Sequence, residues 1–252
     1  MYNSYASPEI TNCTFTNNII ECAGGHDGSG GGMYNKDSSP TLTNCTFANN
    51  RVNGSIYGHG GGICNNRVSI NSPTITLTNC TFSGNSVSGT YGRGGAMYND
   101  CYDPTLTNCT FSGNSASEYG AGMYNNWTSN TTLTNCILWD ATTTTIEEIY
   151  NYDNCETTID TCIIQFGKGS ISNKESSSIK YINNPITTDP KLQPLADNGG
   201  FIQTCKVEEG SSAIGAGKVI TDVTTDARGY IRSTTAPTIG AYEYNGIAPS
   251  QK

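Results

Sequence analysis

One repeat dominates this chain, and its clearest copy is Gly-Ala-Met-Tyr-Asn-Asp-Cys-Tyr-Asp-Pro-Thr-Leu-Thr-Asn-Cys-Thr-Phe-Ser-Gly-Asn at residues 95–114. Its central Asn-Cys pair recurs at residues 12–13, 44–45, 79–80, 108–109 and 135–136, with Thr161-Cys162 as a degraded sixth copy. A Met-Tyr-Asn landmark keeps the same spacing, at residues 1–3, 33–35, 97–99 and 123–125, with variants at 63–65 and 149–151. Two landmarks that move together indicate a repeat array, in which neighbouring copies must stack to bury their apolar residues.

Each copy predicts short strands joined by sharp corners. Leu106 and Phe111 are flanked by threonines, which fit a pleated, half-exposed surface, and Asn108 lies between them where the chain would turn. No window has apolar residues at helical spacing over three turns. Three strand-like pieces per copy fit coils stacked about 4.8 Å apart. We therefore predict an all-β protein, a right-handed single-stranded parallel β-helix of about seven to eight coils with a C-terminal capping segment.

Composition and sequence pattern define the domain organisation and exclude two partner classes. Residues 1–188 are predicted to form the coils, and residues 189–252 to form a cap or last coils continuous with the same solenoid. Only 13% of residues are charged, the net charge is −8, and the 13 Lys and Arg residues are scattered, so we expect no nucleic-acid partner. No apolar run approaches the roughly 18 residues that would span a bilayer, so we expect no membrane span.

The C-terminal quarter carries a resemblance to a known class of bacterial surface proteins. Five blocks follow in order, at residues 189–192, 194–200, 210–217, 225–229 and 239–244. They resemble the C-terminal module of bacterial surface β-helix proteins described as "choice-of-anchor", while the repeats resemble the polymorphic outer-membrane-protein type and, more loosely, the pectin-lyase-like superfamily. The resemblance implies an extracellular or cell-surface location. We expect Asp226, Arg228 and Glu243 of this segment to be structural.

The eleven cysteines divide into two groups. Six occupy one repeat position, where stacked thiols would act as small buried hydrophobes, and we predict a mostly reduced ladder there: Cys13, Cys45, Cys80, Cys109, Cys136 and Cys162. The other five can pair or stay free: Cys22, Cys64, Cys101, Cys155 and Cys205. No Cys-x-x-Cys spacing occurs, and we expect no metal and no cofactor.

Glycine-rich corners between the repeats contain a weak candidate for a polar site. Its members could approach one another on adjacent coils: His26, Asp27, His59, Arg93 and Glu118. Polysaccharide-degrading β-helices need clustered acids for calcium or for acid–base chemistry, and the tightest repeats have few. Solvated loop residues are therefore the favoured interpretation, and catalysis stays open. An outward column of Tyr2, Tyr34, Tyr98, Tyr124 and Tyr150 is the nearest candidate for a sugar platform.

A second candidate surface is made of threonines. The recurring Thr-Leu-Thr places pairs of outward threonines on successive coils: Thr41, Thr43, Thr76, Thr78, Thr105, Thr107, Thr132 and Thr134. Such arrays resemble the flat faces of β-helical antifreeze proteins. Glu9 and Asp160 are expected to break the array at its two ends, and threonine is the default outward residue on any such strand.

Three functions from different classes follow from these observations. The leading prediction is a non-catalytic, extracellular structural or adhesive β-helix. The alternatives are a carbohydrate-binding or polysaccharide-degrading β-helix, with a glycan as partner, and ice binding through the threonine array. Because the chain opens inside a repeat, we also expect the first coil to pair with another subunit, with head-to-tail stacking into a fibre.

Overall fold

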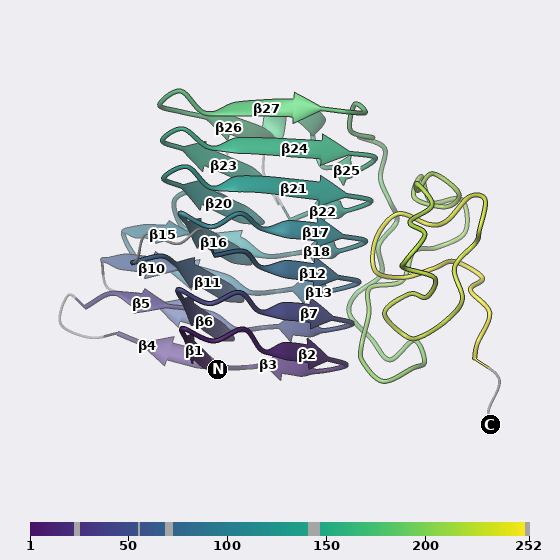
Figure 1. Ribbon diagram of the computed structural model, residues 1–252, viewed down its shortest axis with the longest axis horizontal. Coiled ribbons are helices and arrows are strands. Elements are labelled where there is room, and N and C mark those ends of the chain that lie inside the picture. Colours follow the sequence, from purple (N-terminus) through teal and green to yellow (C-terminus); the bar gives the residue numbers. More distant parts are fainter. Residues whose placement is uncertain (23–25, 55, 69–72, 141–146, 250–252) are drawn as a thin grey trace.

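The computed structural model describes residues 1–22, 26–54, 56–68, 73–140 and 147–249, and it is a parallel β-helix (Figure 1). Two of its sheets contain seven strands each, so the solenoid has seven coils. Every pair of neighbouring strands in these sheets is parallel and in register with the repeat, as in Leu77↔Leu106 and Tyr98↔Tyr124. The predicted fold class is confirmed.

Three sheets correspond to the three strand-like pieces of the repeat. The Met sheet contains β1 (Tyr2–Ser4), β6 (Met33–Lys36), β11 (Ile63–Asn66), β16 (Met97–Asp100), β20 (Met123–Asn126), β23 (Ile149–Tyr152) and β26 (Ile171–Asn173). The Thr sheet contains β2 (Glu9–Thr11), β7 (Thr41–Thr43), β12 (Thr76–Thr78), β17 (Thr105–Thr107), β21 (Asn130–Thr134), β24 (Glu156–Asp160) and β27 (Ser178–Tyr181). The Phe sheet contains β3 (Thr14–Thr16), β8 (Thr46–Ala48), β13 (Thr81–Ser83), β18 (Thr110–Ser112), β22 (Ile137–Trp139) and β25 (Ile163–Ile164).

Among the described residues, two further sheets occur in the earlier coils, and the sequence did not reveal them. The Val sheet contains β4 (Ile19–Glu21), β9 (Arg51–Asn53), β14 (Ser86–Ser88) and β19 (Ser115–Ala116). The outer sheet contains β5 (Gly28–Ser29), β10 (Tyr57–His59) and β15 (Tyr91–Arg93). Gly58 and Gly92 of the outer sheet pack against the Val87 side chain, and an added Cβ at Gly58 would lie 2.6 Å from it. Glycine is therefore required for the two sheets to approach this closely.

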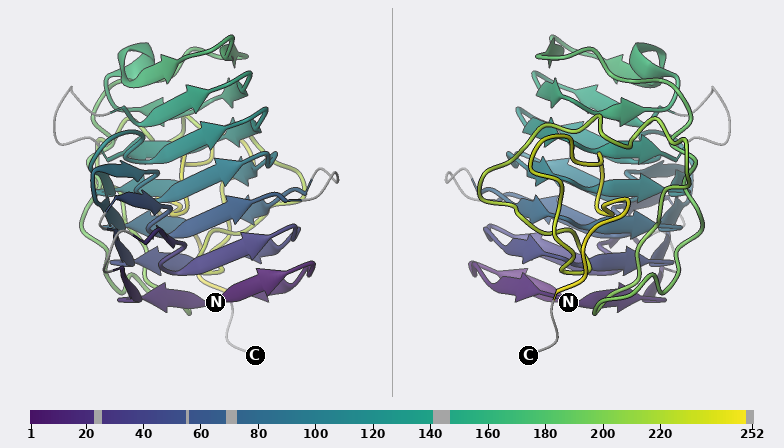
Figure 2. Two further views of the ribbon diagram at one scale, coloured as in Figure 1. Left: turned by 90° about the vertical axis from the view of Figure 1, so that its left-hand side faces the viewer. Right: turned by 90° about the vertical axis from the view of Figure 1, so that its right-hand side faces the viewer.

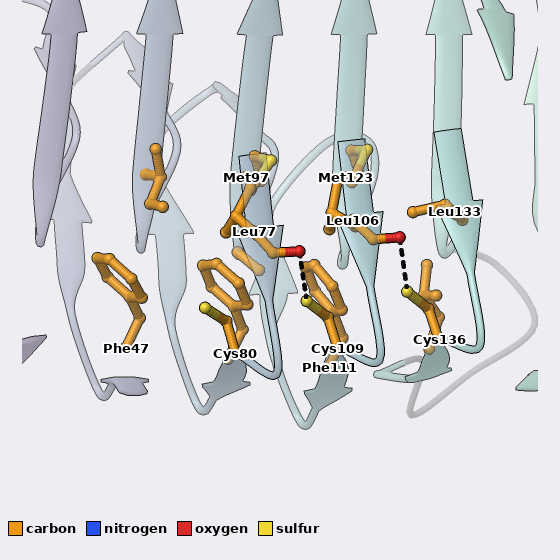
Figure 3. Close-up of a cluster of buried hydrophobic side chains, with 14 of the residues drawn as sticks. Phe47, Leu77, Cys80, Met97, Leu106, Cys109, Phe111, Met123, Leu133 and Cys136 are labelled. Carbon is orange, nitrogen blue, oxygen red and sulfur yellow. Dashed lines mark hydrogen bonds between the residues drawn. The ribbon is translucent and has the colours of Figure 1, made fainter. Parts of the chain in front are cut away.

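The core is built from columns of like residues, because register places each repeat position directly over its copy (Figure 3). Leu77, Leu106 and Leu133 form one column and are fully buried. Phe47, Phe82 and Phe111 form another, with stacked rings whose centroids lie 5.0 Å and 4.7 Å apart. Burial of these rows along the whole axis supplies the main stabilisation that a single repeat lacks.

Asparagines, most of them buried, connect the coils by side-chain ladders. In the Met sheet each amide donates to the next coil's side-chain oxygen at 2.7–2.9 Å, through Asn3, Asn35, Asn65, Asn99, Asn125, Asn151 and Asn173. A second series lies at the corner between the Thr and Phe sheets, and is called the corner ladder below: Asn12, Asn44, Asn79, Asn108 and Asn135. Its members have φ between 51° and 53°, a left-handed conformation that asparagine tolerates well. The corner therefore explains why asparagine precedes the repeated cysteine.

The C-terminal segment lies along the side of the solenoid instead of continuing its axis (Figures 1 and 2). The Thr46 hydroxyl donates to the Gln203 carbonyl at 2.8 Å, and the Ala241 amide donates to the Thr110 hydroxyl at 2.9 Å. Ile137 and Ile163 of the Phe sheet pack with Val207, Ala213 and Ile239. The prediction that residues 189–252 form a cap or last coils that continue the solenoid is therefore corrected. The segment lies along the Phe sheet because the outward apolar residues of that sheet are stabilised when they are removed from water.

The described residues contain one short helix, the 3-10 helix η1 (Gly167–Ser170). In this part of the chain, no helix has the length and apolar character needed to cross a membrane.

Candidate functional site

The Thr sheet presents two straight columns of threonine on its outer face. Strand pairing aligns Thr41, Thr76, Thr105 and Thr132 in one column and Thr43, Thr78, Thr107 and Thr134 in the other. The structure lengthens each column by one residue, because Thr158 pairs with Thr132 and Thr11 pairs with Thr43. Each column therefore spans five coils, which is one coil more than the sequence motif indicated.

Charged residues close this threonine face at its two ends. Glu9 pairs with Thr41 on the first coil, and Asp160 pairs with Thr134 on the sixth. The expected interruptions are confirmed by this register. Thr11, Thr41 and Thr105 are exposed, and the other threonines of both columns are half-buried. Residues 222–225 of the C-terminal segment lie beside Thr43 and Thr78 in a shallow groove.

The threonine face is neutral and regular. Copies within a column are separated by about 4.8 Å, the spacing of hydrogen-bonded strands, and the two columns by about 6.6 Å, two residues along a strand. Each side chain offers one methyl and one hydroxyl, and the intervening leucine points inward and is buried. The columns can thus combine apolar contact with hydrogen bonding at fixed intervals, and the nearest charge beside Thr43 and Thr78 in the groove is Asp222.

Part of the polar site predicted at the glycine-rich corners lies in the outer sheet. His59 pairs with Arg93 on adjacent strands, and Arg93 Nε donates to Glu118 Oε2 at 2.8 Å. His26 and Asp27 are exposed on the first coil, beside the outer sheet. The structure thus joins His59, Arg93 and Glu118 in one row, as expected for adjacent coils, and leaves His26 outside it.

Of the predicted sugar platform, Tyr2 is exposed and Tyr34 is half-buried, whereas Tyr98, Tyr124 and Tyr150 are covered, which corrects the expectation of an open column of five rings. Tyr98, Tyr124 and Tyr150 stack with ring centroids 5.3 Å and 5.2 Å apart and are only 3–6% exposed. The His59 ring lies 4.4 Å from the Tyr98 ring, and the Arg93 guanidinium lies 5.3 Å from the Tyr124 ring. The rings point away from the solenoid core, but residues of the outer sheet bury them.

Burial also determines the chemistry of His59. Loss of hydration, and then repulsion from Arg93, lowers the pKa of this imidazole to about 4, and Asp27 opposes the shift. His59 is therefore neutral near pH 7. Because Arg93 is already paired with Glu118 and stacked on Tyr124, the row is engaged in packing the outer sheet onto the Met sheet.

A buried acid pair was missed by sequence reasoning. Asp140 occupies the repeat position of Asn114, and its Oδ1 accepts hydrogen bonds from the Asn114 backbone N–H at 3.0 Å and side-chain amide at 2.7 Å. Glu148 occupies the position of Gly122, and its Oε1 accepts from the Asp140 backbone N–H at 2.8 Å. Burial, and then the Glu148 carboxyl, raises the pKa of Asp140 well above its usual range. Alignment of the repeats shows both substitutions and could have revealed the pair.

The polar residues of the C-terminal segment form an internal network. Asp226 is fully buried and accepts from Arg228 Nε at 2.9 Å, from Arg228 Nη2 at 2.7 Å and from the Glu243 backbone N–H at 2.9 Å. The Arg228 guanidinium lies 4.0 Å and 3.8 Å from the ring centroids of Tyr230 and Tyr242. These contacts fold the segment, as expected for structural roles of Asp226, Arg228 and Glu243.

All eleven cysteines are free thiols in this structure. In the repeat column, buried thiols donate to the carbonyl two residues earlier and to a carbonyl of the preceding coil, as Cys109 does to Thr107 at 3.5 Å and to Leu77 at 3.6 Å (Figure 3). Burial raises the thiol pKa of Cys109 and Cys136 well above its usual range. Cys13 is the exposed end of this column, and Cys22 and Cys101 are half-buried.

Among the described residues, no group of three or more His, Cys, Asp or Glu side chains is arranged to hold a metal ion. No family model, curated protein or solved structure matches this chain.

Proposed function

We propose that this protein is a non-catalytic structural or adhesive β-helix whose contact surface is the threonine face. The observation that carries the proposal is the register of the Thr sheet, which aligns two columns of five threonines across consecutive coils. A rigid row of neutral hydroxyl and methyl groups suits a partner that is itself regular and uncharged. Binding to such a partner gains from many identical weak contacts, because the rigid scaffold has already ordered the side chains.

The other polar residues already interact with neighbouring side chains, which supports a role without catalysis. His59 is neutral and packs half-buried against Tyr98, Arg93 is paired with Glu118, and Asp226 is enclosed by its own network. A general acid or base must reach the proton that it transfers, and these groups face their packing partners. A screen against pectins and other acidic glycans tests this point. Turnover that disappears on Asp27→Ala or Arg93→Ala would replace the proposal with the polysaccharide-degrading alternative.

Adhesion itself is tested by sedimentation with insoluble neutral matrices. The purified chain should co-sediment with at least one of microcrystalline cellulose and chitin, and no soluble sugar should be released. Calcium should not be required, because the threonine columns contain no carboxylate between Glu9 and Asp160, and Asp222 is the single carboxylate in the groove beside Thr43 and Thr78. Co-sedimentation that depends on calcium would instead favour an acidic glycan-binding site.

Ice binding is a second candidate, and the spacing of the threonines is the observation that favours it. The threonines recur at about 4.8 Å within a column and about 6.6 Å between columns, and such regular Thr-x-Thr faces resemble those of β-helical antifreeze proteins. Thermal hysteresis and shaped ice crystals are expected at high protein concentration. The absence of both effects would remove this candidate.

The proposal also includes the location of the protein and the stacking of its copies into an assembly. The resemblance to bacterial surface proteins supports an extracellular or cell-surface site, and stacking through the first coil stays a prediction. β1, β2, β3 and β4 each form an edge of their sheet, where a parallel strand of another copy could pair. Light scattering at several dilutions, with electron microscopy, should show growth with concentration and filaments. A monomer at micromolar concentration without filaments would contradict the assembly.

A further inference from the structure

A cavity of about 250 Å³ lies between the C-terminal segment and the corner ladder. Its walls are residues 218–224 and 231–237, and Asn108 of the corner ladder also lines it. The lining is mainly aliphatic, with Val219, Ile220, Val223, Ile231 and Pro237. Val219 and Ile231 are 45% and 46% exposed, so the mouth of the cavity presents branched apolar side chains to solvent. Its volume is near the lower end of the roughly 300–1,000 Å³ usual for small-molecule sites.

The cavity lies where the corner ladder is interrupted. Asn44 donates to Asn12, Asn79 donates to Asn44, and Asn135 donates to Asn108, at 3.0–3.1 Å. The link from Asn108 to Asn79 is missing, because Arg232 Nη2 donates to Asn79 Oδ1 at 3.0 Å instead. The Asn108 side-chain nitrogen therefore has no hydrogen-bond acceptor among the described residues, although Asn108 is only 2% exposed.

Because Asn108 lines the cavity, a ligand that displaces water from its amide nitrogen must accept that hydrogen bond, or a polar group is left unpaired at a cost in free energy. In this ladder the four other asparagines face protein partners or the open first coil, whereas the free nitrogen of Asn108 belongs to a residue that lines an apolar cavity. This is the usual design of a small-molecule site, in which a mostly aliphatic cavity contains a few fixed polar groups that orient the ligand.

The other polar groups determine which acceptor fits. Arg232 also lines the cavity, but its guanidinium is already engaged by the Thr225, Thr238 and Gly240 carbonyls, by Asn79, and by the Glu243 carboxylate. Lys218 Nζ is paired with Asp160 at 3.0 Å. A carboxylate ligand would lose its hydration and gain mainly one neutral amide donor, so burial would oppose it. A neutral carbonyl loses much less hydration free energy when it is buried.

We propose that this cavity binds a small aliphatic molecule with one neutral carbonyl group, with the Asn108 amide donating to the carbonyl oxygen. The branched side chains of Val219, Val223 and Ile231 hold the aliphatic part. The site is separate from the threonine face in its chemistry, and either one can function without the other.

The test is a heteronuclear NMR titration of the full chain with three probes of similar shape: isobutyl methyl ketone, isohexane and isovalerate. The ketone should give saturable shifts at the Asn108 side-chain amide and at the Val219 and Ile231 methyls. Isohexane should bind more weakly, and isovalerate at least tenfold more weakly than the ketone. No saturable shift with the ketone would overturn the proposal, and so would equal affinity for the ketone and either of the other probes.

Two variants and a control locate the binding. Asn108→Asp keeps an oxygen acceptor for Asn135 and removes the donor, so the affinity for the ketone should fall by about two- to tenfold while that for isohexane stays unchanged. Ile231→Trp should fill the mouth and abolish binding of both probes. Ile247→Trp is the control, because Ile247 pairs with Ile231 and does not line the cavity. Unchanged ketone affinity in Asn108→Asp or in Ile231→Trp would place the ligand elsewhere and overturn the assignment.

Discussion

Arg232 Nη2 donates to Asn79 Oδ1 at 3.0 Å, across 153 residues of sequence. This bond joins the C-terminal segment to the corner ladder, and Asn79 reciprocates by donating from its amide to the Thr225 carbonyl at 2.9 Å. Arg232 is 95% buried and is also paired with Glu243 at 3.2 Å. The segment is thus held to the solenoid by directed polar contacts as well as by the apolar contacts of Ile137 and Ile163.

Removal of the Asn79 side chain should loosen the C-terminal segment. Asn79→Gly keeps the left-handed backbone, which glycine adopts without strain, and leaves the Arg232 donor with one acceptor fewer. We expect a loss of about 1–3 kcal/mol in the free energy of unfolding, and faster trypsin cleavage after Lys218.

Asn44→Gly is the matched control for this variant, because Asn44 has the same backbone conformation and its side chain bonds only to its ladder neighbours among the described residues. Its loss should be smaller, and cleavage after Lys218 should be unchanged. Equal effects of the two substitutions would show that the contact with Arg232 does not hold the segment.

The acid pair predicts that stability falls as pH rises. The pKa of Asp140 is raised in the folded chain, so folding takes up a proton above the unfolded pKa of about 3.9. The associated stability is full below that pH and is lost as pH rises through the folded pKa. Asp140→Asn restores the repeat's usual residue and should raise the free energy of unfolding at pH 7 by about 1–2 kcal/mol, with a smaller gain at pH 4.

Urea unfolding of both proteins at the two pH values measures this difference. Asn114→Asp serves as the reciprocal variant, since it adds a carboxyl beside Asp140 and should destabilise the chain most at pH 7. An Asp140→Asn gain that is equal at pH 4 and pH 7 would mean that Asp140 is not protonated in the folded state.

Thiol reactivity should follow burial along the cysteine column. Under native conditions a thiol reagent should label Cys13 rapidly and Cys22 and Cys101 more slowly, because these three are the thiols with exposed surface. The other eight should react only on unfolding, since burial removes access to the sulfur. Peptide mapping after timed labelling identifies the sites. Rapid labelling of Cys109 in the folded chain would contradict the packed column.

The sequence was sufficient for the solenoid because the repeat encodes its own register. Because Leu106 and Phe111 recur with a corner asparagine between them, each residue stacks on its own copy in the next coil. The position of the C-terminal segment could not be derived in this way, because it depends on long-range pairs such as Arg232 with Asn79 that have no repeat signature. The burial of Tyr124 was missed for a related reason, since the strands that cover it are short and glycine-centred.

The candidate sites also divide into those that the repeat predicts and those that depend on residues outside the repeat pattern. The threonine columns were predictable because Thr105 and its copies belong to the repeat. Asp140 and Glu148 are departures from the repeat, and a search for conserved pattern passes over them. Asn108 looks like its four counterparts in sequence, and only the insertion of Arg232 beside it makes its amide different.

The most direct test of the threonine face is a comparison of adsorption isotherms on the matrix that the native chain binds. The double variant Thr76→Lys/Thr105→Lys places two charges at the centre of the first column, while Ser115→Lys places a charge on the exposed surface of the Val sheet as a control. The account predicts at least a tenfold loss of affinity for the double variant, equivalent to about 1.4 kcal/mol, with melting temperature unchanged, and native affinity for Ser115→Lys. Native adsorption by the double variant would contradict the central claim that this face makes the contact.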